Sequence, residues 1–187
     1  MLPPISSFIL TLTSWAIITT APCLYDTHDA AAVTVALTYQ DETVLGVIYH
    51  PFHDELYAAV VDGPATVNGH PAQVTSETEL SQARLILDYS PRDALRQRLN
   101  DLEWDRGIKQ MMRFGGSFAL NMCQVAKGAA DGYFYGRMRN RVKSWDMAVA
   151  ALLVQRAGSC VLDRQGQPLN ALEPQGFVLC HNAKLVP

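Results

Sequence analysis

The chain has 187 residues, of which 49% are hydrophobic and 18% are charged. This balance is that of an ordinary globular protein, and it excludes a disordered chain, a collagen and a coiled coil. The formal net charge of −3 gives no general attraction to nucleic acid or anionic membranes, so an anion would have to be bound by a local cluster. The length suits one domain with a sizeable core.

The cysteines and the N-terminal residues bear on the cellular compartment. The run 5–21 has the length of a signal peptide, but no Lys or Arg precedes it, and it is too short and too rich in Thr and Ser to span a membrane. We interpret it as a β-rich or degraded core segment, with a cleaved signal as the alternative. The cysteines form no CxxC pair and predict buried free thiols in a reducing compartment, the cytoplasm, rather than disulfides or a zinc site. They are Cys23, Cys123, Cys160 and Cys180.

The first half of the chain predicts an antiparallel meander. Asn68-Gly69 is a strong signal for a type I′ turn between two strands. Runs rich in β-branched and aromatic residues, separated by polar turns, indicate the strands. The expected strands are 33–39, 44–49, 56–61 and 72–74.

The second half alternates strands with helices. Ser90 and Ser144 are predicted to be helix N-caps, and Pro91 suits a first helical position. Eight consecutive apolar residues at 147–154 predict a helix that is buried on every side. The expected helices are 90–102, 117–127 and 144–157, and the expected strands are 85–87, 109–114, 131–135, 160–162 and 177–180. The sequence shows neither a repeat nor a linker, so it predicts a single mixed α/β domain over residues 1–187, built in layers.

The first residues of two predicted helices could bind a metal ion or a ligand. Asp146 in a first helical turn is favoured by the helix dipole alone, but it would also present a hard oxygen ligand for Mg²⁺ from a rigid helix. Gly115-Gly116 would let a ligand approach free backbone N–H groups at the other helix start. Ser117 either caps that helix or binds a ligand oxygen, and Phe118 follows it.

These two starts, in their order along the chain, resemble the inositol monophosphatase family of Mg²⁺-dependent phosphomonoesterases. The matching stretches are 112–135 (MRFGGSFALNMCQVAKGAADGYFY) and 144–163 (SWDMAVAALLVQRAGSCVLD), with the hairpin region 35–74 upstream. The resemblance implies a layered αβαβα sugar-phosphatase fold and hydrolysis of a phosphate monoester by a metal-activated water. It also implies that Asp146 binds the metal. Gly116, Ser117 and Phe118 match the segment that touches the substrate alcohol.

The chain departs from the family in its first part. The family's metal-binding Glu on an N-terminal helix and its DPxDGT loop have no counterpart, so residues 1–32 are expected to be an atypical, degraded or truncated segment. Asp26 and Asp29 repeat the Asp-x-x-Asp spacing without the Gly-Thr, and we interpret them as turn residues. Since Mg²⁺ needs near-octahedral oxygen coordination, Asp146 with waters would bind it only weakly, and no side chain is assigned a catalytic role.

The missing N-terminal helices would also leave apolar surface uncovered. This predicts a homo-oligomer, another partner or poor solubility.

Two further clusters have competing interpretations. Tyr135 stands where the family commonly has a Glu, and the alternating Arg137, Arg139, Arg141 and Lys143 form either a solvated basic loop or a contact to an anionic substrate. The histidines of the His50-Pro51-Phe52-His53 run suggest a metal site with Asp54 and Glu55. The family has a comparable turn without a catalytic role, so we interpret them as a surface turn.

The sequence therefore predicts an inositol-monophosphatase-like, Mg²⁺-dependent hydrolase of a small-molecule phosphate monoester, impaired because the first metal motif is missing. The alternative is a catalytically inactive, truncated family member that acts as an interaction module or has no function of its own. We expect no nucleic-acid or membrane partner, because the acidic chain offers no recognition helix. The sequence does not identify the phosphate ester.

Overall fold

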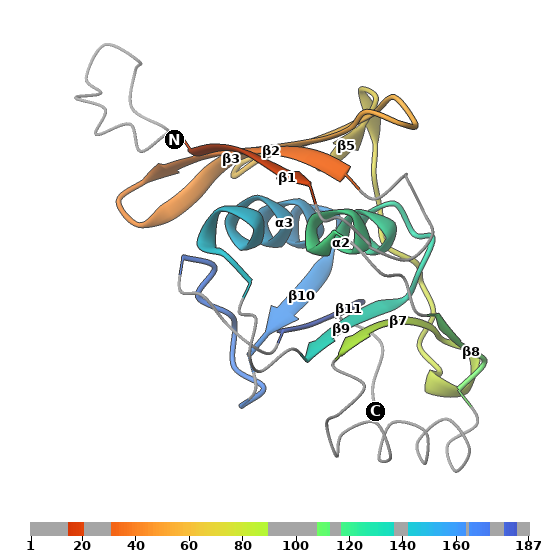
Figure 1. Ribbon diagram of the computed structural model, residues 1–187. Helices are drawn as coiled ribbons and strands as arrows, with labels where there is room; N and C mark the ends of the chain where they lie inside the picture. The colour runs from red at the N-terminus through yellow and green to blue at the C-terminus, as the bar shows by residue number, and fades with distance from the viewer. Residues whose placement is uncertain are drawn as a thin grey trace.

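Two β-sheets enclose a pair of helices in the computed structural model of the chain (Figure 1). The structure describes residues 15–20, 31–89, 108–112, 117–136, 142–163, 165–172 and 178–182. The described layers follow the order sheet, helices, sheet. The expected α/β layered fold is confirmed.

The first sheet is an antiparallel meander in which each strand pairs with the next in the chain. Within the described residues it has six strands in the order β1-β2-β3-β4-β5-β6. They are β1 (Trp15–Thr20), β2 (Ala31–Tyr39), β3 (Glu42–His50), β4 (Glu55–Val60), β5 (Thr66–Val67) and β6 (His70–Pro71).

The turns of this sheet follow the sequence signals. Asn68 and Gly69 both have positive φ, 49° and 78°, as the predicted type I′ turn requires.

The prediction of a strand at 72–74 is wrong. Val74 instead donates its N–H to the carbonyl of Ala157 at 3.0 Å, so the backbone leaves the sheet to meet the end of a helix.

The second sheet is mixed. Its order is β10-β11-β9-β7-β8, where β7 runs parallel to both β8 and β9 and the other neighbours are antiparallel. A short 3₁₀ turn, η2 (Leu80–Gln82), precedes it. The strands are β7 (Arg84–Tyr89), β8 (Gln110–Met112), β9 (Gly132–Gly136), β10 (Ser159–Leu162) and β11 (Val178–Asn182). The predicted helix 90–102 lies outside the described residues.

The helix layer consists of α2 (Phe118–Ala126) and α3 (Ser144–Arg156), which lie side by side between the sheets (Figure 1). All eight residues of the apolar run 147–154 are buried, as predicted. Helix α3 comes so close to β3 at Gly46 that a Cβ atom added to this glycine would lie 2.6 Å from Cγ2 of Val149. The predicted cap at Ser144 is wrong by one residue, because Lys143 is the N-cap and its side chain makes no capping hydrogen bond.

The N-terminal run and the cysteines agree with their interpretation where they are described, except that Cys160 is not fully buried. Residues 15–20 form β1, as expected for a β-rich segment, and no described helix is long and apolar enough to cross a membrane. Cys123 and Cys180 are buried free thiols, whereas Cys160 is a free thiol that is only half-buried. Cys23 lies outside the described residues. Burial raises the pKa of the Cys180 thiol to about 12, which keeps it protonated.

Candidate functional site

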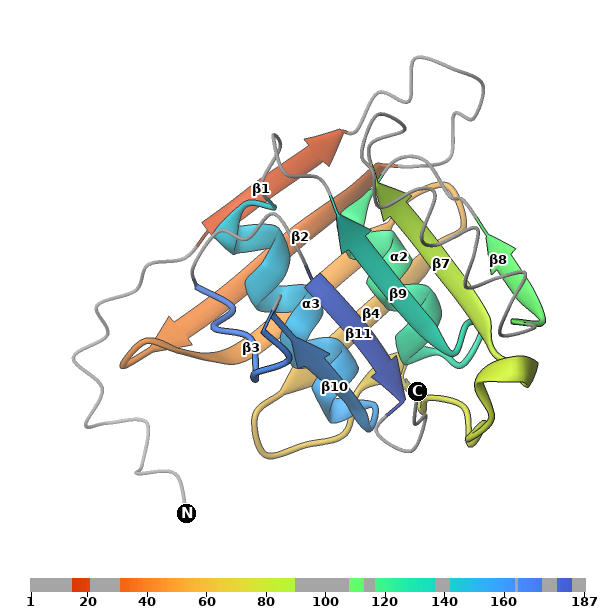
Figure 2. The same cartoon turned by 90° about the horizontal axis from the view of Figure 1, so that it is seen from below.

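The topology brings the two helix starts to one edge of the molecule. Because β7, β8 and β9 are parallel, and α2 connects β8 to β9, α2 begins at the carboxyl ends of these strands. The next helix, α3, follows β9 and begins at the same edge (Figure 2). In α/β folds, ligands bind outside the carboxyl ends of the parallel strands.

Asp146 occupies the first turn of α3, where its charge meets the positive end of the helix dipole. Its side chain is 8% exposed. The Thr34 hydroxyl of β2 donates a long hydrogen bond of 3.5 Å to Oδ1 of Asp146. The carboxylate is therefore held between the helix layer and the first sheet.

Ser117 is the N-cap of α2. Its Oγ accepts a hydrogen bond of 3.3 Å from the Leu120 N–H, and the residue is buried. Of the two roles considered for Ser117, the structure therefore shows capping. Gly116, the other residue expected to approach a ligand, lies outside the described residues.

Phe118 opens α2 and packs into an aromatic group in the core. Its ring centroid lies 5.5 Å from that of Tyr133 and 5.4 Å from that of Tyr135. Tyr135 is 5% exposed, so its ring belongs to the core. Arg137, Arg139 and Arg141 lie outside the described residues, and Lys143 precedes α3 as an exposed side chain.

The oxygen atoms that the structure places at Asp146 fall short of what Mg²⁺ needs. The ion demands near-octahedral oxygen coordination, with clustered carboxylates to offset its dehydration. The Thr34 hydroxyl lies within 3.5 Å of the Asp146 carboxylate and adds a second oxygen atom to the site. Within the described chain Asp146 belongs to no group of three potential metal ligands. Asp26 and Asp29 lie outside the described residues. One carboxylate and one hydroxyl do not fit Mg²⁺ by themselves, and no catalytic step is assigned to them.

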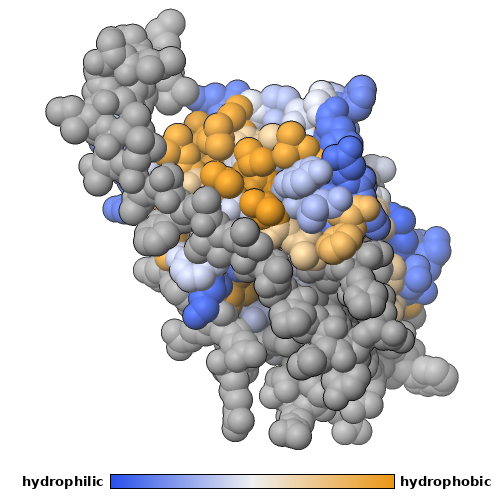
Figure 3. Space-filling view, turned by 45° about the horizontal axis from the view of Figure 1, so that its top comes forward, coloured by the Kyte–Doolittle hydropathy of each residue, from blue (hydrophilic) through white to orange (hydrophobic). Residues whose placement is uncertain are grey.

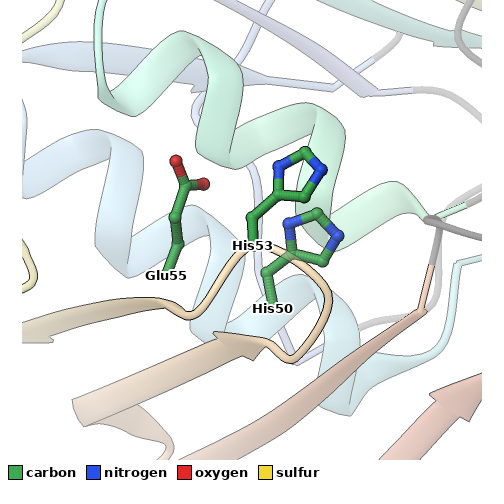
Figure 4. Close-up of side chains that lie close together, drawn as sticks. All are labelled: His50, His53 and Glu55. Carbon is green, nitrogen blue, oxygen red and sulfur yellow. The ribbon is translucent and has the colours of Figure 1, made fainter.

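A different group of side chains is brought together by the turn between β3 and β4. His50, His53 and Glu55 each place a potential ligand atom within 4.8 Å of the others (Figure 4). Lys127, at the end of α2, forms an ion pair with Glu55 in which both carboxylate oxygens lie 3.0 Å from Nζ. Sequence reasoning noted the histidines as a turn but missed this ion pair, because its partners are 72 residues apart.

The comparisons with known proteins identify the family. Residues 25–186 match the model of the Inositol monophosphatase family. The chain belongs to the inositol monophosphatase family. It is 32% identical over 145 residues to inositol monophosphatase 2 of Rattus norvegicus, a match that covers 75% of this chain and 49% of that protein. Inositol-1-monophosphatase of Synechocystis sp. is 29% identical over 160 residues, covering 84% of this chain and 54% of that protein.

Solved structures of the inositol monophosphatase family share the fold. The extragenic suppressor protein SuhB from Bartonella henselae superposes with a TM-score of 0.71 at 28% identity, covering 83% of this chain and 59% of that chain. Inositol monophosphatase from Anabaena gives 0.70 at 28% identity, covering 84% and 61%. The chain spans about half the length of these two curated relatives.

Proposed function

We propose that this chain is an inositol-monophosphatase-like domain that hydrolyses a small-molecule phosphate monoester with Mg²⁺, and that its activity is impaired. The position of Asp146 is the observation that supports this proposal. Its carboxylate lies at the buried start of α3, at the edge where α2 also begins. The family match supplies the reaction class.

The same site explains why we expect weak activity. The amino ends of α2 and α3 present backbone N–H groups at one edge, an arrangement that favours a phosphate anion. We expect Gly116, Ser117 and Phe118 to border the alcohol part of the substrate. Ser117 contributes by capping α2 and so fixing the position of the helix start. Among the described residues Asp146 belongs to no group of three potential metal ligands, so we expect weak binding of Mg²⁺.

Phosphate release tests the proposal. Inositol monophosphate and an aryl phosphate are incubated with the chain, with and without Mg²⁺, for the wild type, Asp146→Asn and the control Asp62→Asn at an exposed turn. We expect slow, Mg²⁺-dependent release that Asp146→Asn abolishes and Asp62→Asn leaves unchanged. Equal release by Asp146→Asn would contradict the role of this carboxylate.

The second candidate function is that of a catalytically inactive interaction module. One observation favours it: the face of the first sheet that points away from the helices is apolar (Figure 3). The paired positions on this outer face are Leu37, Leu45 and Val60; Val35, Val47 and Ala58; and Val33, Tyr49 and Leu56. A folded chain that releases no phosphate in the assay above would favour this candidate, with a second copy of the chain as the simplest partner.

The free thiols support a cytoplasmic location for either function.

A further inference from the structure

The turn between β3 and β4 assembles three potential metal ligands from six consecutive residues. His50, the last residue of β3, pairs in register with Glu55, the first residue of β4. Side chains two positions apart in a strand point to the same face of the sheet. Ile48 and Tyr57, which are two positions from His50 and Glu55, are fully buried, so His50 and Glu55 also point toward the helices. His53 lies in the four-residue turn between them, where its N–H donates to the His50 carbonyl at 3.3 Å.

The three side chains lie near one another, at separations somewhat longer than those around a bound ion. The two imidazole rings have centroids 4.4 Å apart, and Figure 4 shows the side chains of His50, His53 and Glu55 gathered beside one another. The three ligand atoms lie within 4.8 Å of one another, whereas Zn²⁺ with bonds of about 2.1 Å would draw tetrahedral ligands to roughly 3.4 Å. His50 is 5% exposed, whereas His53 is exposed on the turn, so the His53 side chain has room to rotate toward the other two.

Glu55 supplies the negative charge of the cluster. Partial burial would raise the pKa of its carboxyl, but hydrogen bonds from Tyr57 and Lys127 and the charge of Lys127 outweigh burial and leave the pKa below its usual value. The carboxylate is therefore ionised at neutral pH. The contacts from Tyr57 and Lys127 also fix its orientation, as hydrogen bonds to metal-binding carboxylates do in known sites.

We propose that His50, His53 and Glu55 form a site for a divalent cation of the zinc class. Imidazole ligands suit Zn²⁺, whereas Mg²⁺ prefers oxygen, so this site is selective against the family's metal. Two histidines and one carboxylate leave a fourth tetrahedral position for water. Since Glu55 is tied to Lys127, a bound ion fastens the β3–β4 turn to the end of α2. The site shares no residue with Asp146, so it does not depend on the proposed phosphatase activity.

Zinc binding to the chelator-treated chain tests the proposal by calorimetry, and Co²⁺ reports the ligand geometry through its visible absorption. We expect one Zn²⁺ per chain, no competition from equimolar Mg²⁺, and visible bands from tetrahedral Co²⁺. His53→Ala should lower the Zn²⁺ affinity at least about tenfold and abolish these bands. Because His53 is exposed, we expect this variant to fold, and circular dichroism checks that it does. Glu55→Gln gives a second, nearly isosteric test.

Two controls separate this site from other metal binding. His70→Ala removes an exposed histidine from β6, and Asp146→Asn alters the proposed phosphatase site; both should keep the wild-type affinity for Zn²⁺. The proposal is overturned if the wild type binds no Zn²⁺, if His53→Ala binds as tightly as the wild type, or if His70→Ala loses affinity equally. None of these outcomes depends on phosphate release.

Discussion

Asp131 anchors the start of the second sheet. Its Oδ2 accepts hydrogen bonds from the backbone N–H of Arg84 at 2.7 Å and from Nε of Arg84 at 3.2 Å, and its side chain is 2% exposed. Arg84 also donates from its guanidinium to the Gly128 carbonyl at 3.3 Å. One carboxylate therefore joins the start of β7 to the segment that enters β9.

We expect Asp131→Ala to lower the free energy of unfolding by about 1–3 kcal/mol, because the partly buried Arg84 N–H loses its acceptor. Urea unfolding followed by circular dichroism measures the change. Asp62→Ala, at an exposed position, is the matched control and should change stability by less than about 0.5 kcal/mol. A similar loss in both variants would contradict the anchoring role.

The same contact predicts a pH dependence. Burial would raise the pKa of the Asp131 carboxyl, but hydrogen bonds from Thr75 and Arg84 and the Arg84 charge outweigh it, so the folded pKa lies below 3.8. A carboxyl with a lowered folded pKa stabilises the fold above its unfolded pKa, and this stabilisation is lost as the pH falls through the folded value. The difference between wild type and Asp131→Ala should therefore be constant near neutrality and shrink below about pH 4.

At the residue scale, the sequence predicts local roles better than distant partners. The cap at Ser117 follows from its place before an apolar helical pattern, since the acceptor and the donor are three residues apart. The Arg84–Asp131 and Lys127–Glu55 pairs span 47 and 72 residues, and they exist because the two sheets and α2 are brought together. No local pattern contains that information.

At the element scale, α2 depends on its cap. We expect Ser117→Ala to lower the free energy of unfolding by about 0.5–2 kcal/mol, because the Leu120 N–H loses its acceptor. Chemical denaturation measures the loss. Ser144→Ala is the matched control, since Ser144 is the first residue of α3 rather than its cap. If Ser144→Ala destabilises the chain more than Ser117→Ala, the assignment of the caps is wrong.

The contact between α3 and β3 requires glycine at position 46. A methyl group there would meet Cγ2 of Val149 at 2.6 Å, so we expect Gly46→Ala to destabilise the fold by about 1–3 kcal/mol. Adding Val149→Ala should restore part of this loss, and a double-mutant cycle measures the coupling. Strictly additive effects would show that the two residues do not compete for the same space.

The elements themselves follow largely from the sequence. Runs rich in β-branched and aromatic residues give β2 to β4, and the run of eight consecutive apolar residues gives α3. The expected strand 72–74 fails because Val74 bonds to the end of α3, a tertiary contact that overrides local preference. At the site, the Ser144-Trp145-Asp146 sequence places Asp146 at the start of a helix. Its hydrogen bond to Thr34 depends on the packing of β2 against α3, which the sequence does not show.

At the scale of the whole molecule, the outer face of the first sheet predicts self-association. Leu56 and Val60 are 45% and 44% exposed on this face, beside the other apolar positions of β2 and β3. We expect the wild type to sediment as an oligomer, and Leu56→Lys with Val60→Lys to shift it toward the monomer. Analytical ultracentrifugation measures the shift.

The control for this experiment is Phe52→Lys. Phe52 is an apolar residue, 53% exposed, on the turn between β3 and β4 rather than on the sheet face, so this variant should keep the wild-type oligomeric state. A monomeric wild type would refute the self-association of the sheet face.

The helix layer also sets the order in which the chain can complete its fold during synthesis. Thr34 and Asp146, which meet across the interface of β2 and α3, are separated by 112 residues. The inner face of the meander therefore has no partner from α3 until this helix has left the ribosome. Since the strands of the meander precede both described helices in the chain, their inner face is exposed for most of the synthesis of the described chain, and a chaperone can bind it during that time.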